Sequence, residues 1–600
     1  MDRREVAHLL RTIGALLEVK GEDPFKVRSY GRAADSIESS DYDLEKLAGE
    51  GRLTDIPGVG KNLEPKVREM ILTGSSSYLE RLVAEIPEGV LDLLKVPGIG
   101  PKTARLLYTA LGIASLDDLD AALKAHKIQG LPGMGRKREE IMAEGLAEIR
   151  RYAGRISIGV ALPVAESIVA SLRQKSIAAA LVGEVRRAEE TVSALDLLVL
   201  KNPDESPSSI LERSGLVPGA SSSALEQSWD DAHGRYVFGT GLGVPLRLHF
   251  AGMNAFWPRA LWLTGPSEFL DYFSKKARER GLVLTEAGLV REGETLEAAR
   301  TGFFGDVGTA EARFPKNAEI EDIMDARFED LLFEMVSLSP IPPEVRHRKE
   351  FWEASAAGKV PPLVDPNDLR GDIHLHTLWS DGVAGIEAMV QAAIGMGYSY
   401  IAITDHATDM KMIRGITHER LDEYLREIRQ VQEKYPGFRV YSGVEVDILR
   451  DGRLYLPDED LARLDVVIAS IHNEIDSKGD GVRRLIKAAM NPHVDVLGHP
   501  AGRLIGRRAG IVSGLEEVLE AAATTGTAIE INSSPDRLDL PENLVALGYS
   551  KGVRFAVCSD AHSPGGLGTI RYGLLTCARR AGIPPEYVVN TKPALPWVTG

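Results

Sequence analysis

The sequence predicts a multidomain protein with an all-α N-terminal region, an α+β central region and a C-terminal distorted βα barrel. Up to about residue 150, short amphipathic helical patterns alternate with Gly-rich turns. Shorter β-rich runs between helices follow, up to about residue 315. From residue 371 onward, β-rich runs alternate with helical patterns, which is typical of a parallel sheet. Because 600 residues exceed what one hydrophobic core supports, several domains are expected.

One Gly-rich pattern occurs three times in the N-terminal region, at residues 56–60, 96–100 and 131–135. Each copy lies between helical stretches and reads apolar, Pro, Gly, apolar, Gly. The glycines permit positive φ, and the next helix offers free N–H groups that bind phosphate without reading sequence. The motif resembles the helix-hairpin-helix of DNA repair proteins. Alternatively, a copy is only a tight turn. The predicted DNA contacts are Gly58, Gly60, Lys61, Gly98, Gly100, Lys102, Gly133, Gly135 and Arg136.

The central region has β-rich runs at residues 180–182, 195–200 and 246–250, which predict an α+β fold. A Pro/Asp-rich stretch at residues 360–369 predicts a linker before the barrel. Within the barrel, the expected β runs are residues 400–404, 439–441, 466–471, 494–498, 528–532 and 554–559.

Nine side chains of metal-liganding types occur in this region, and nearly all of them lie at or just past the C-terminal end of a β run, where βα barrels carry their chemistry. Imidazole and carboxylate are the ligands that borderline divalent metals prefer, and a metal cluster hydrolyses phosphate esters without a covalent nucleophile. Glu445 is the expected bridging carboxylate, and Glu445, Asp560 and His562 are the expected catalytic residues. The predicted ligands are His374, His376, Asp381, His406, Glu445, His472, His499, Asp560 and His562.

Further charged residues accompany the ligands. Asp372, Asp405 and Asp447 either orient ligand histidines or are solvated carboxylates. Arg503, Arg507 and Arg508 follow His499, and they either bind a substrate phosphate or are ordinary surface charges.

The whole chain resembles the bacterial family X DNA polymerases that end in a PHP (polymerase and histidinol phosphatase) domain. Residues 21–30, the three Gly-rich hairpins and residues 183–192 carry this resemblance. It implies that His374, His376, Glu445 and Asp560 hold one metal, that His406 and His499 with Asp381 hold others, and that His472 and His562 complete the set. The implied domains are 1–80 lyase-like, 81–152 fingers-like, 153–255 degenerate nucleotidyltransferase-like palm, 256–348 thumb-like, 349–369 linker and 370–600 PHP.

The palm departs from the family pattern where two metals would bind. The family reads Thr-Val-Gly-Asp-x-Asp, but residues 193–196 read Ser-Ala-Leu-Asp, so that only Asp196 is left. Pro245 stands where a third Asp belongs, and Glu184 replaces a serine that helps to hold the triphosphate. Since one carboxylate cannot bridge two Mg²⁺ ions, the polymerase centre is expected to be inactive and without Mg²⁺. Arg186 and Arg187 either still contact phosphate or pair with acids such as Glu189.

The resemblance also implies a 5′-deoxyribose-phosphate lyase site in the first domain. Lys66 falls at the position of the Schiff-base amine, and Lys26 and Tyr30 fall at positions that bind the 5′-phosphate. The alternative is a solvated surface lysine.

Composition limits the partners. The net charge of −16 argues against a broad basic coat for nucleic acid, although backbone amides at helix ends need no such coat. No apolar run is long enough for a membrane span, no signal region opens the chain, and the two cysteines suit a reducing cytoplasm. We therefore expect a cytoplasmic protein, and we expect it to be a monomer. Its expected partner is gapped or 3′-ended DNA. Its expected cofactors are three divalent ions, either Mn²⁺ or Zn²⁺, with Fe²⁺ as the alternative.

These observations together predict a DNA-binding, metal-dependent phosphoesterase with an inactive polymerase centre, a 3′-5′ exonuclease or 3′-end processing enzyme of DNA repair. Three alternatives are an active family X polymerase with exonuclease, a non-catalytic DNA-binding scaffold, and a small-molecule phosphatase.

Overall fold

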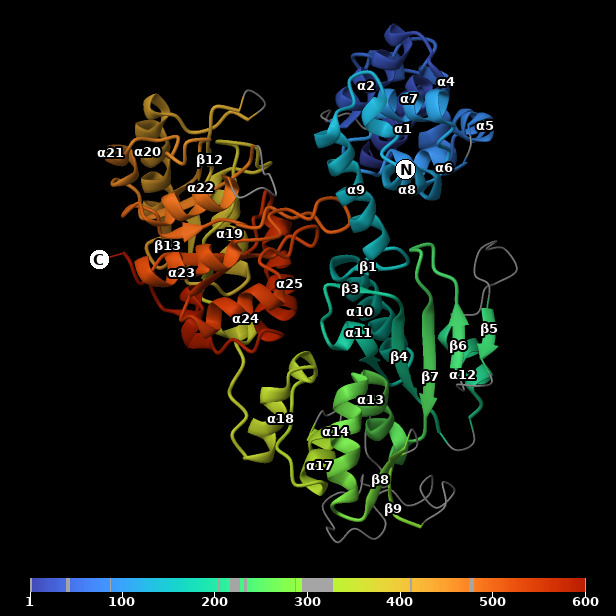
Figure 1. Cartoon of the computed structure of the whole chain (residues 1–600), viewed down its shortest axis with the longest axis vertical. Coiled ribbons are helices and arrows are strands. Elements are labelled where there is room, and N and C mark those ends of the chain that lie inside the picture. The colour runs from blue at the N-terminus through green and yellow to red at the C-terminus, as the bar shows by residue number, and fades with distance from the viewer. Residues whose placement is uncertain are drawn as a thin grey trace. The chain divides into compact units, whose positions relative to one another are not determined.

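The computed structural model of the chain describes residues 3–38, 44–86, 88–202, 205–215, 227–230, 235–285, 288–293, 327–410, 413–473 and 480–598. Two compact units divide the chain: Met1–Ala153 with Gly506–Ala509, and Gly154–Ile505 with Gly510–Gly600 (Figure 1). None of the helices formed by the described residues combines the length and the apolar character that a membrane span needs.

The N-terminal unit is all-α, as the sequence predicts. The stripe of α1 (Arg3–Lys20) buries Leu10, Ile13 and Leu16 completely. Ser76 and Ser115 cap the N-termini of their helices by accepting hydrogen bonds from backbone N–H groups. The other elements are α2 (Pro24–Glu38), α3 (Leu44–Glu50), η1 (Leu53–Asp55), α4 (Glu64–Thr73), α5 (Ser77–Glu85), α6 (Glu88–Leu93), α7 (Pro101–Leu111), α8 (Leu116–Lys124), η2 (Ile128–Gly130) and α9 (Arg136–Arg151).

The three Gly-rich hairpins share one backbone geometry. In each, the second apolar residue donates to the carbonyl of the first, at 3.0 Å: Val59 to Ile56, Ile99 to Val96 and Met134 to Leu131. The first glycines, Gly58, Gly98 and Gly133, have φ of +85°, +83° and +74°, a region that favours glycine. The carbonyls of Gly60, Gly100 and Gly135 accept hydrogen bonds from the following helix. That helix starts directly after Gly100 and Gly135, but α4 starts only at Glu64.

The central region forms a mixed five-stranded sheet of order β2-β4-β7-β6-β5, in which β4 and β7 run parallel (Figure 1). Its predicted runs correspond to β2, β4 and β7. The elements are β1 (Ile156–Ser157), α10 (Ile158–Gln174), β2 (Ala179–Val182), α11 (Gly183–Arg186), β3 (Thr191–Val192), β4 (Leu195–Leu200), α12 (Pro207–Ser214), β5 (Gln227–Asp230), β6 (Arg235–Phe238) and β7 (Leu246–Ala251).

A smaller aromatic core follows, in which Phe269, Phe273 and Phe333 are fully buried. It is formed by η3 (Met253–Ala255), α13 (Phe256–Thr264), α14 (Ser267–Arg278), β8 (Leu282–Thr285), β9 (Gly288–Arg291), α17 (Arg327–Met335), η4 (Pro343–Val345) and α18 (Lys349–Ala356). The thumb-like region predicted at 256–348 includes residues 294–326, which lie outside the described residues.

The segment 349–369 is more structured than the linker that the sequence predicts. Its first part forms α18, whose Phe351 and Trp352 are buried in the aromatic core. Tyr272 stacks on Trp352 with ring centroids 5.1 Å apart and donates to its carbonyl at 3.0 Å. The second part of the segment has the Pro/Asp-rich composition and contains the short helix η5 (Pro366–Asp368).

The C-terminal region forms a nearly closed parallel barrel, which confirms the predicted fold class. Seven strands follow the order β10-β11-β13-β14-β15-β16-β17, with β12 beside β13. The strands are β10 (Gly371–Asp372), β11 (Tyr400–Ile403), β12 (His406–Ala407), β13 (Arg439–Asp447), β14 (Val466–Ser470), β15 (Val496–Leu497), β16 (Ala528–Asn532) and β17 (Phe555–Cys558).

Helices cover the outside of this barrel (Figure 1). The chain passes through α19 (Ile386–Gly395), α20 (His418–Lys434), α21 (Asp458–Leu461), α22 (Asp480–Ala489), α23 (Leu515–Thr525), α24 (Glu542–Ser550), η6 (Pro564–Thr569), α25 (Ile570–Gly573), η7 (Leu574–Arg579), η8 (Pro585–Tyr587) and η9 (Val589–Thr591). Past the strand ends, the backbone N–H of His376 donates to Ala561 at 2.8 Å, and that of Asp560 donates to His374 at 3.0 Å. These two hydrogen bonds join the first and last segments of the barrel.

A buried ion triad ties α11 of the palm to α17. Glu329 lies 2.5 Å from Arg186 and 3.1 Å from Arg346, and Glu329 and Arg346 are 5% and 1% exposed. Burial alone would raise the pKa of Glu329, but the two guanidinium groups outweigh it and lower the pKa to about 2.

We predict that Glu329→Gln destabilises this unit by about 3–5 kcal/mol, because it leaves the buried Arg346 and the partly buried Arg186 without their carboxylate. Urea unfolding followed by tryptophan fluorescence measures the loss, since Trp257 and Trp352 lie in this core. Glu279→Gln, which removes an exposed partner of Lys276, is the matched control and should leave the unfolding midpoint unchanged.

The same triad makes stability depend on pH. A carboxylate whose pKa is lowered on folding stabilises the protein fully above its ordinary value of 4.5, and this stabilisation is lost as the pH falls toward 2. The difference in stability between the original chain and Glu329→Gln should therefore shrink over this interval. A difference that stays constant from neutral pH to pH 2 would contradict this assignment.

Candidate metal centre

The nine predicted ligands meet at one end of the barrel, and most of them lie just beyond the C-terminal end of a strand. His374 and His376 follow β10, His472 follows β14, and His499 follows β15. Asp560 and His562 follow β17, whereas Glu445 lies near the end of β13 and His406 begins β12. Because all barrel strands are parallel, their ends share one rim, and the sequence pattern alone brings these side chains together.

Glu445 lies at the centre of this group and is 1% exposed. Its two oxygens lie within 3.6 Å of five imidazoles. Oε2 is 3.4 Å from His374, 3.6 Å from His376 and 2.8 Å from His406. Oε1 is 3.0 Å from both His472 and His499. Both oxygens thus face nitrogen atoms from different strand ends, which is the arrangement that a bridging carboxylate needs.

Asp381 organises a more open group at the rim. Its Oδ2 lies 3.5 Å from His406 and 3.4 Å from His562, and its Oδ1 lies 3.8 Å from His376. Asp381 and His562 are 33% and 40% exposed, so substrate can reach this side of the centre. Of the three residues that the family resemblance groups together, His406 contacts both Asp381 and Glu445, whereas His499 contacts Glu445.

The donor set fits divalent metals. Three overlapping groups have ligand atoms within 4.8 Å of one another: His376, Asp381, His406 and His562; His374, His376 and Glu445; and His406, Glu445 and His472. The Nε2 atoms of His374 and His376 lie only 3.3 Å apart, and Asp560 is 3.1 Å from His376. Imidazole nitrogens and carboxylate oxygens that converge in this way form sites that could hold borderline divalent ions.

The electrostatics of the centre favour positive charge. Burial lowers the pKa of His406, but Glu445 and Asp381 outweigh it and raise the pKa to about 10. Burial also lowers the pKa of His472, but Glu445 and Asp447 outweigh it and raise the pKa to about 9. Burial would raise the pKa of Glu445, whereas the surrounding imidazoles hold it well below its usual range. The carboxylates therefore attract protons to the imidazoles, and metal ions compete with those protons.

Three imidazoles are oriented by hydrogen-bond acceptors behind them. The Nδ1 atom of His374 lies 2.6 Å from Glu530, that of His472 lies 2.6 Å from Asp447, and that of His562 lies 2.9 Å from the Asp560 carbonyl. Each acceptor favours the tautomer with hydrogen on Nδ1, which leaves the lone pair of Nε2 for the centre.

The three flanking aspartates behave differently from one another. Asp447 contacts an imidazole, as one alternative holds. Asp405 instead accepts from the backbone and hydroxyl of Thr377 and from Ser380, and Asp372 accepts from the backbone N–H groups of His374 and Ser559. All three are buried, so none is a solvated carboxylate.

Sequence reasoning missed two residues on β16. Glu530 is fully buried and contacts His374, and Asn532 donates to Asp560 at 3.0 Å. Polar residues in an otherwise apolar strand, Ala528-Ile529-Glu530-Ile531-Asn532, were the available signal.

Arg503 lies inside the fold. It is 9% exposed and lies 2.7 Å from Glu190 of the central region, so it is not an ordinary surface charge. Other contacts join the same parts: Ser157 donates to Pro535 at 3.0 Å, and Arg571 lies 3.0 Å from Glu166.

Asp196 and Pro245, which the family resemblance assigns to the polymerase centre, lie close together. Leu195 donates to the carbonyl of Pro245 at 2.9 Å, so Pro245 lies beside the end of β4 that carries Asp196. Asp196 is 2.9 Å from His249 and 3.7 Å from Arg247. The carboxylate of Asp196 therefore already has two partners from β7.

The palm arginines pair with acids. Arg187 lies 2.5 Å from Glu189, and Arg186 belongs to the buried triad with Glu329. Glu184 accepts hydrogen bonds from Arg155 at 3.2 Å and from the Ser193 hydroxyl at 2.9 Å. Of the two alternatives for these arginines, the structure thus favours structural ion pairs.

Lys66 lies in an aromatic pocket of the N-terminal unit. Its amine donates to the Tyr30 hydroxyl at 2.7 Å and lies 3.9 Å from the centroid of the Tyr78 ring. Burial, together with Lys26 and Arg81, lowers the pKa of this amine. The predicted hairpin cations have a different environment: Lys61, Lys102 and Arg136 are exposed.

Comparison with known proteins finds matches to family models in the N-terminal and C-terminal regions of the chain. Family models match residues 1–76 (helix-hairpin-helix domain), 90–148 (SAM-like helix-hairpin-helix tandem) and 372–534 (PHP domain). Probable phosphatases of Thermoanaerobacter sp. (strain X514) and Caldanaerobacter subterraneus subsp. tengcongensis are 33% and 34% identical over 232 residues, 37% of this chain and 89% and 86% of theirs.

A further relative extends over the full length. The DNA polymerase/3′-5′ exonuclease PolX of Bacillus subtilis (strain 168) is 33% identical over 601 residues, which cover 99% of this chain and 98% of that protein. The resemblance read from the sequence is thereby confirmed, and the chain belongs to the bacterial family X DNA polymerases that end in a PHP domain.

Proposed function

We propose that this protein hydrolyses phosphodiester bonds at the 3′ ends of DNA, as a 3′-5′ exonuclease or 3′-end processing enzyme, at the rim of its C-terminal barrel. The observation that carries the proposal is Glu445, a buried carboxylate with five imidazoles within 3.6 Å of its oxygens. A non-catalytic scaffold has no need for so costly an arrangement of buried charge.

The nine residues would hold three divalent ions, Mn²⁺ or Zn²⁺, and seven of the nine, all except His499 and Asp560, form the three overlapping groups. Ions bound there would supply the activated water and the charge neutralisation that phosphodiester hydrolysis needs. Glu445 would bridge neighbouring groups, and Glu530 and Asp447 would fix the tautomers of His374 and His472. Asp560 and His562 would border the substrate, since His562 is the most exposed imidazole of the set.

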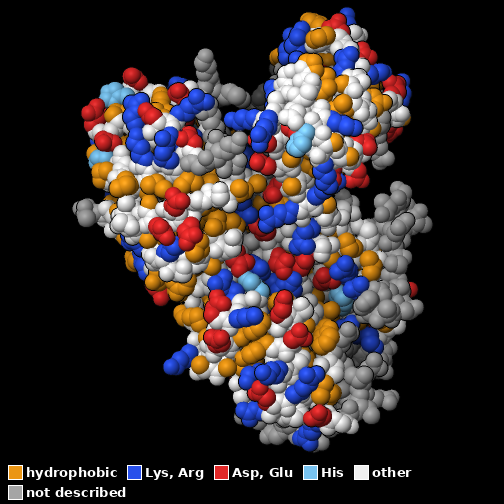
Figure 2. Space-filling model, viewed as in Figure 1, with side chains coloured by type: hydrophobic (Ala, Val, Ile, Leu, Met, Phe, Trp, Pro, Cys, Tyr) orange, Lys and Arg blue, Asp and Glu red, His pale blue; other side chains and the backbone are white. Residues whose placement is uncertain are grey.

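The N-terminal hairpins support DNA as the substrate, bound through phosphates. Three copies with the same turn geometry and exposed cations suit the sequence-independent binding of a DNA backbone. Such binding tolerates the acidic balance of the chain, and Figure 2 shows basic and acidic side chains interspersed over the visible face. The presence of these N-terminal hairpins also argues against a small-molecule phosphatase, which would not need to bind DNA.

We infer that the polymerase centre is inactive. The relative from Bacillus subtilis carries DNA polymerase in its name, but two of the three metal-binding positions in this chain are Ala194 and Pro245. The remaining Asp196 is engaged with His249 and Arg247. One engaged carboxylate does not hold two Mg²⁺ ions, so templated synthesis is not expected.

A second activity, 5′-deoxyribose-phosphate lyase, is favoured by the surroundings of Lys66. A Schiff base forms from an unprotonated amine, and the lowered pKa of Lys66 increases that form. Tyr30 would orient the amine through its 2.7 Å hydrogen bond.

The main proposal predicts that the metal-loaded protein shortens a 5′-labelled gapped duplex from its 3′ end. We expect His374→Ala and Asp560→Ala to reduce the rate about 100- to 1000-fold, because each removes a ligand from the buried cluster. Asp196→Ala should leave the rate unchanged. Product ladders measured with and without dNTPs report degradation and extension in the same experiment, and elemental analysis reports the ions bound.

Two outcomes would contradict this proposal. If the pure protein bound no transition metal and added metal restored no cleavage, the hydrolytic function would be wrong. Extension of the primer with dNTPs, abolished in Asp196→Ala, would show instead that the polymerase centre is active.

Glu530→Gln should weaken metal binding about 10- to 100-fold, because the amide is a poorer acceptor for the Nδ1 hydrogen of His374. Competition with a chromophoric chelator measures the affinity, and excess metal should restore most of the cleavage rate. The exposed Glu520, which pairs with Lys551, provides the control Glu520→Gln. Equal affinity in the original chain and Glu530→Gln would exclude an orienting role for Glu530.

For the lyase activity, borohydride should trap a covalent complex between the protein and a 5′-deoxyribose-phosphate end. Lys66→Ala should lose the complex, and Lys61→Ala, five residues earlier and also basic, should retain it. Trapping that survives in Lys66→Ala would assign the amine to another residue.

A further inference from the structure

Two large aliphatic side chains are exposed beside the ligand Asp381. Leu378 is 64% exposed and Val383 is 68% exposed, on the loop between β10 and α19 that carries Asp381. The backbone N–H of Val383 donates to the carbonyl of His562 at 2.8 Å, so Val383 directly adjoins the most exposed imidazole of the centre. Single exposed aliphatic residues are common, but two on one loop at the entrance to a site call for a reason.

The loop holds these side chains in place. The backbone N–H of Leu378 donates to the carbonyl of Ala384 at 3.0 Å. This hydrogen bond brings the two arms of the loop together, so that Leu378 and Val383 lie close to each other. The buried Asp405 accepts from Thr377 and from the Ser380 hydroxyl, at 2.8 and 2.7 Å. A Cβ on Gly382 would come within 2.5 Å of the His376 carbonyl oxygen, so the turn packs tightly against the metal-binding segment. The exposure is therefore a property of an ordered loop.

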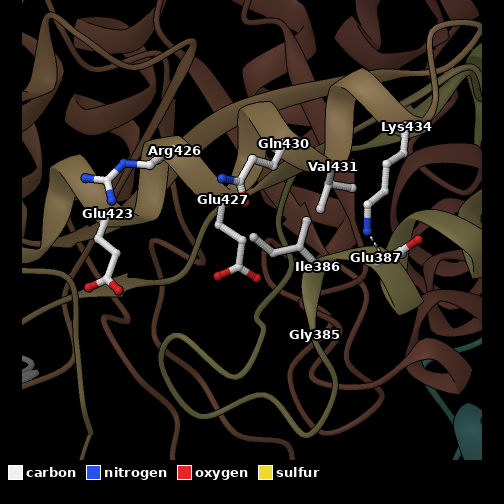
Figure 3. A pocket seen from close by; sticks show the side chains of 9 residues that line it. All are labelled: Gly385, Ile386, Glu387, Glu423, Arg426, Glu427, Gln430, Val431 and Lys434. Carbon is white, nitrogen blue, oxygen red and sulfur yellow. Dashed lines mark hydrogen bonds and ion pairs between the residues drawn. The ribbon is translucent and has the colours of Figure 1, made fainter.

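The outer side of the loop is braced by α20. The Trp379 ring packs edge-on against Tyr424 at 5.4 Å and under Arg420 at 4.9 Å. Its indole N–H donates to Glu427 at 2.9 Å. Glu427 lines a pocket between the start of α19 and α20, on whose far side Lys434 pairs with Glu387 (Figure 3). The large aromatic side chain of the loop is thus used for support, and the two aliphatic ones are left free at the entrance.

We propose that Leu378 and Val383 form an apolar contact for the terminal nucleobase of a 3′ end whose phosphodiester lies at Asp381 and His562. This inference rests on the proposed function and adds the residues that recognise a base beside the scissile bond. Every nucleobase has an apolar face, so such a contact accepts any sequence, which matches binding through phosphates in the hairpins. A base held here would also be separated from its partner strand, so single-stranded or frayed ends are the substrate form.

The test compares two single-stranded oligonucleotides that differ only in the terminal nucleotide. One ends in a normal nucleotide, and the other ends in a tetrahydrofuran residue, which keeps the backbone but lacks the base. We expect kcat/KM of the original chain to be about 10-fold higher for the normal end. In Leu378→Ser and Val383→Ser, this preference should fall toward one, while cleavage of the baseless end and the metal content remain unchanged. Leu378→Met should keep the preference.

Met490→Ser provides the matched control. Met490 is 69% exposed and follows α22, which leads into the N-terminal end of β15, so it lies at the opposite end of the barrel from the ligands. An equal loss for both oligonucleotides in Leu378→Ser and Val383→Ser, or no preference in the original chain, would overturn the inference while leaving hydrolysis established. Failure of the metal-loaded original chain to cleave either oligonucleotide would overturn the proposed function itself.

Discussion

The buried charge of Glu445 is the main electrostatic constraint on the C-terminal barrel. Removing the charge of Glu445 from water costs several kcal/mol unless neighbouring groups compensate for it. The parallel strands provide that compensation, because their ends bring imidazoles from four separate segments to its two oxygens. A second layer of carboxylates then holds the imidazoles, as Glu530 holds His374 and Asp447 holds His472. The arrangement of the barrel strands and the buried polar residues together stabilise the charge of Glu445.

Charged residues on and beside the central five-stranded sheet are paired with one another. Asp196 pairs with His249, Arg187 with Glu189, and Arg186 with Glu329. The central region also packs against the barrel, where Arg503 and Glu190 form an ion pair. These contacts hold the two regions together.

The sequence predicts most of the fold and site because both depend on local patterns. Parallel strands share a rim, so polar residues that follow β runs had to meet there, and the repeated Pro-Gly patterns had to form turns. Glu530 escaped prediction because one acid in a strand gives no spacing signal, and its partner His374 is 156 residues away. The same holds for Arg503, whose partner Glu190 is 313 residues away. The helix α18 was hidden by the proline-rich composition of the segment that follows it.

The seam of the barrel, where its first and last segments meet, is formed by residues that are also proposed to bind metal. The first and last segments are joined by hydrogen bonds at His374, His376, Asp560 and Ala561, so three of the four residues in the seam are also proposed ligands. Ions at these positions would act as a clasp between the two ends of a long stretch of chain. Binding energy would then be shared between holding the domain shut and preparing it for hydrolysis. A cell that starves of the metal would consequently lose catalytic turnover and the resistance of this domain to unfolding together.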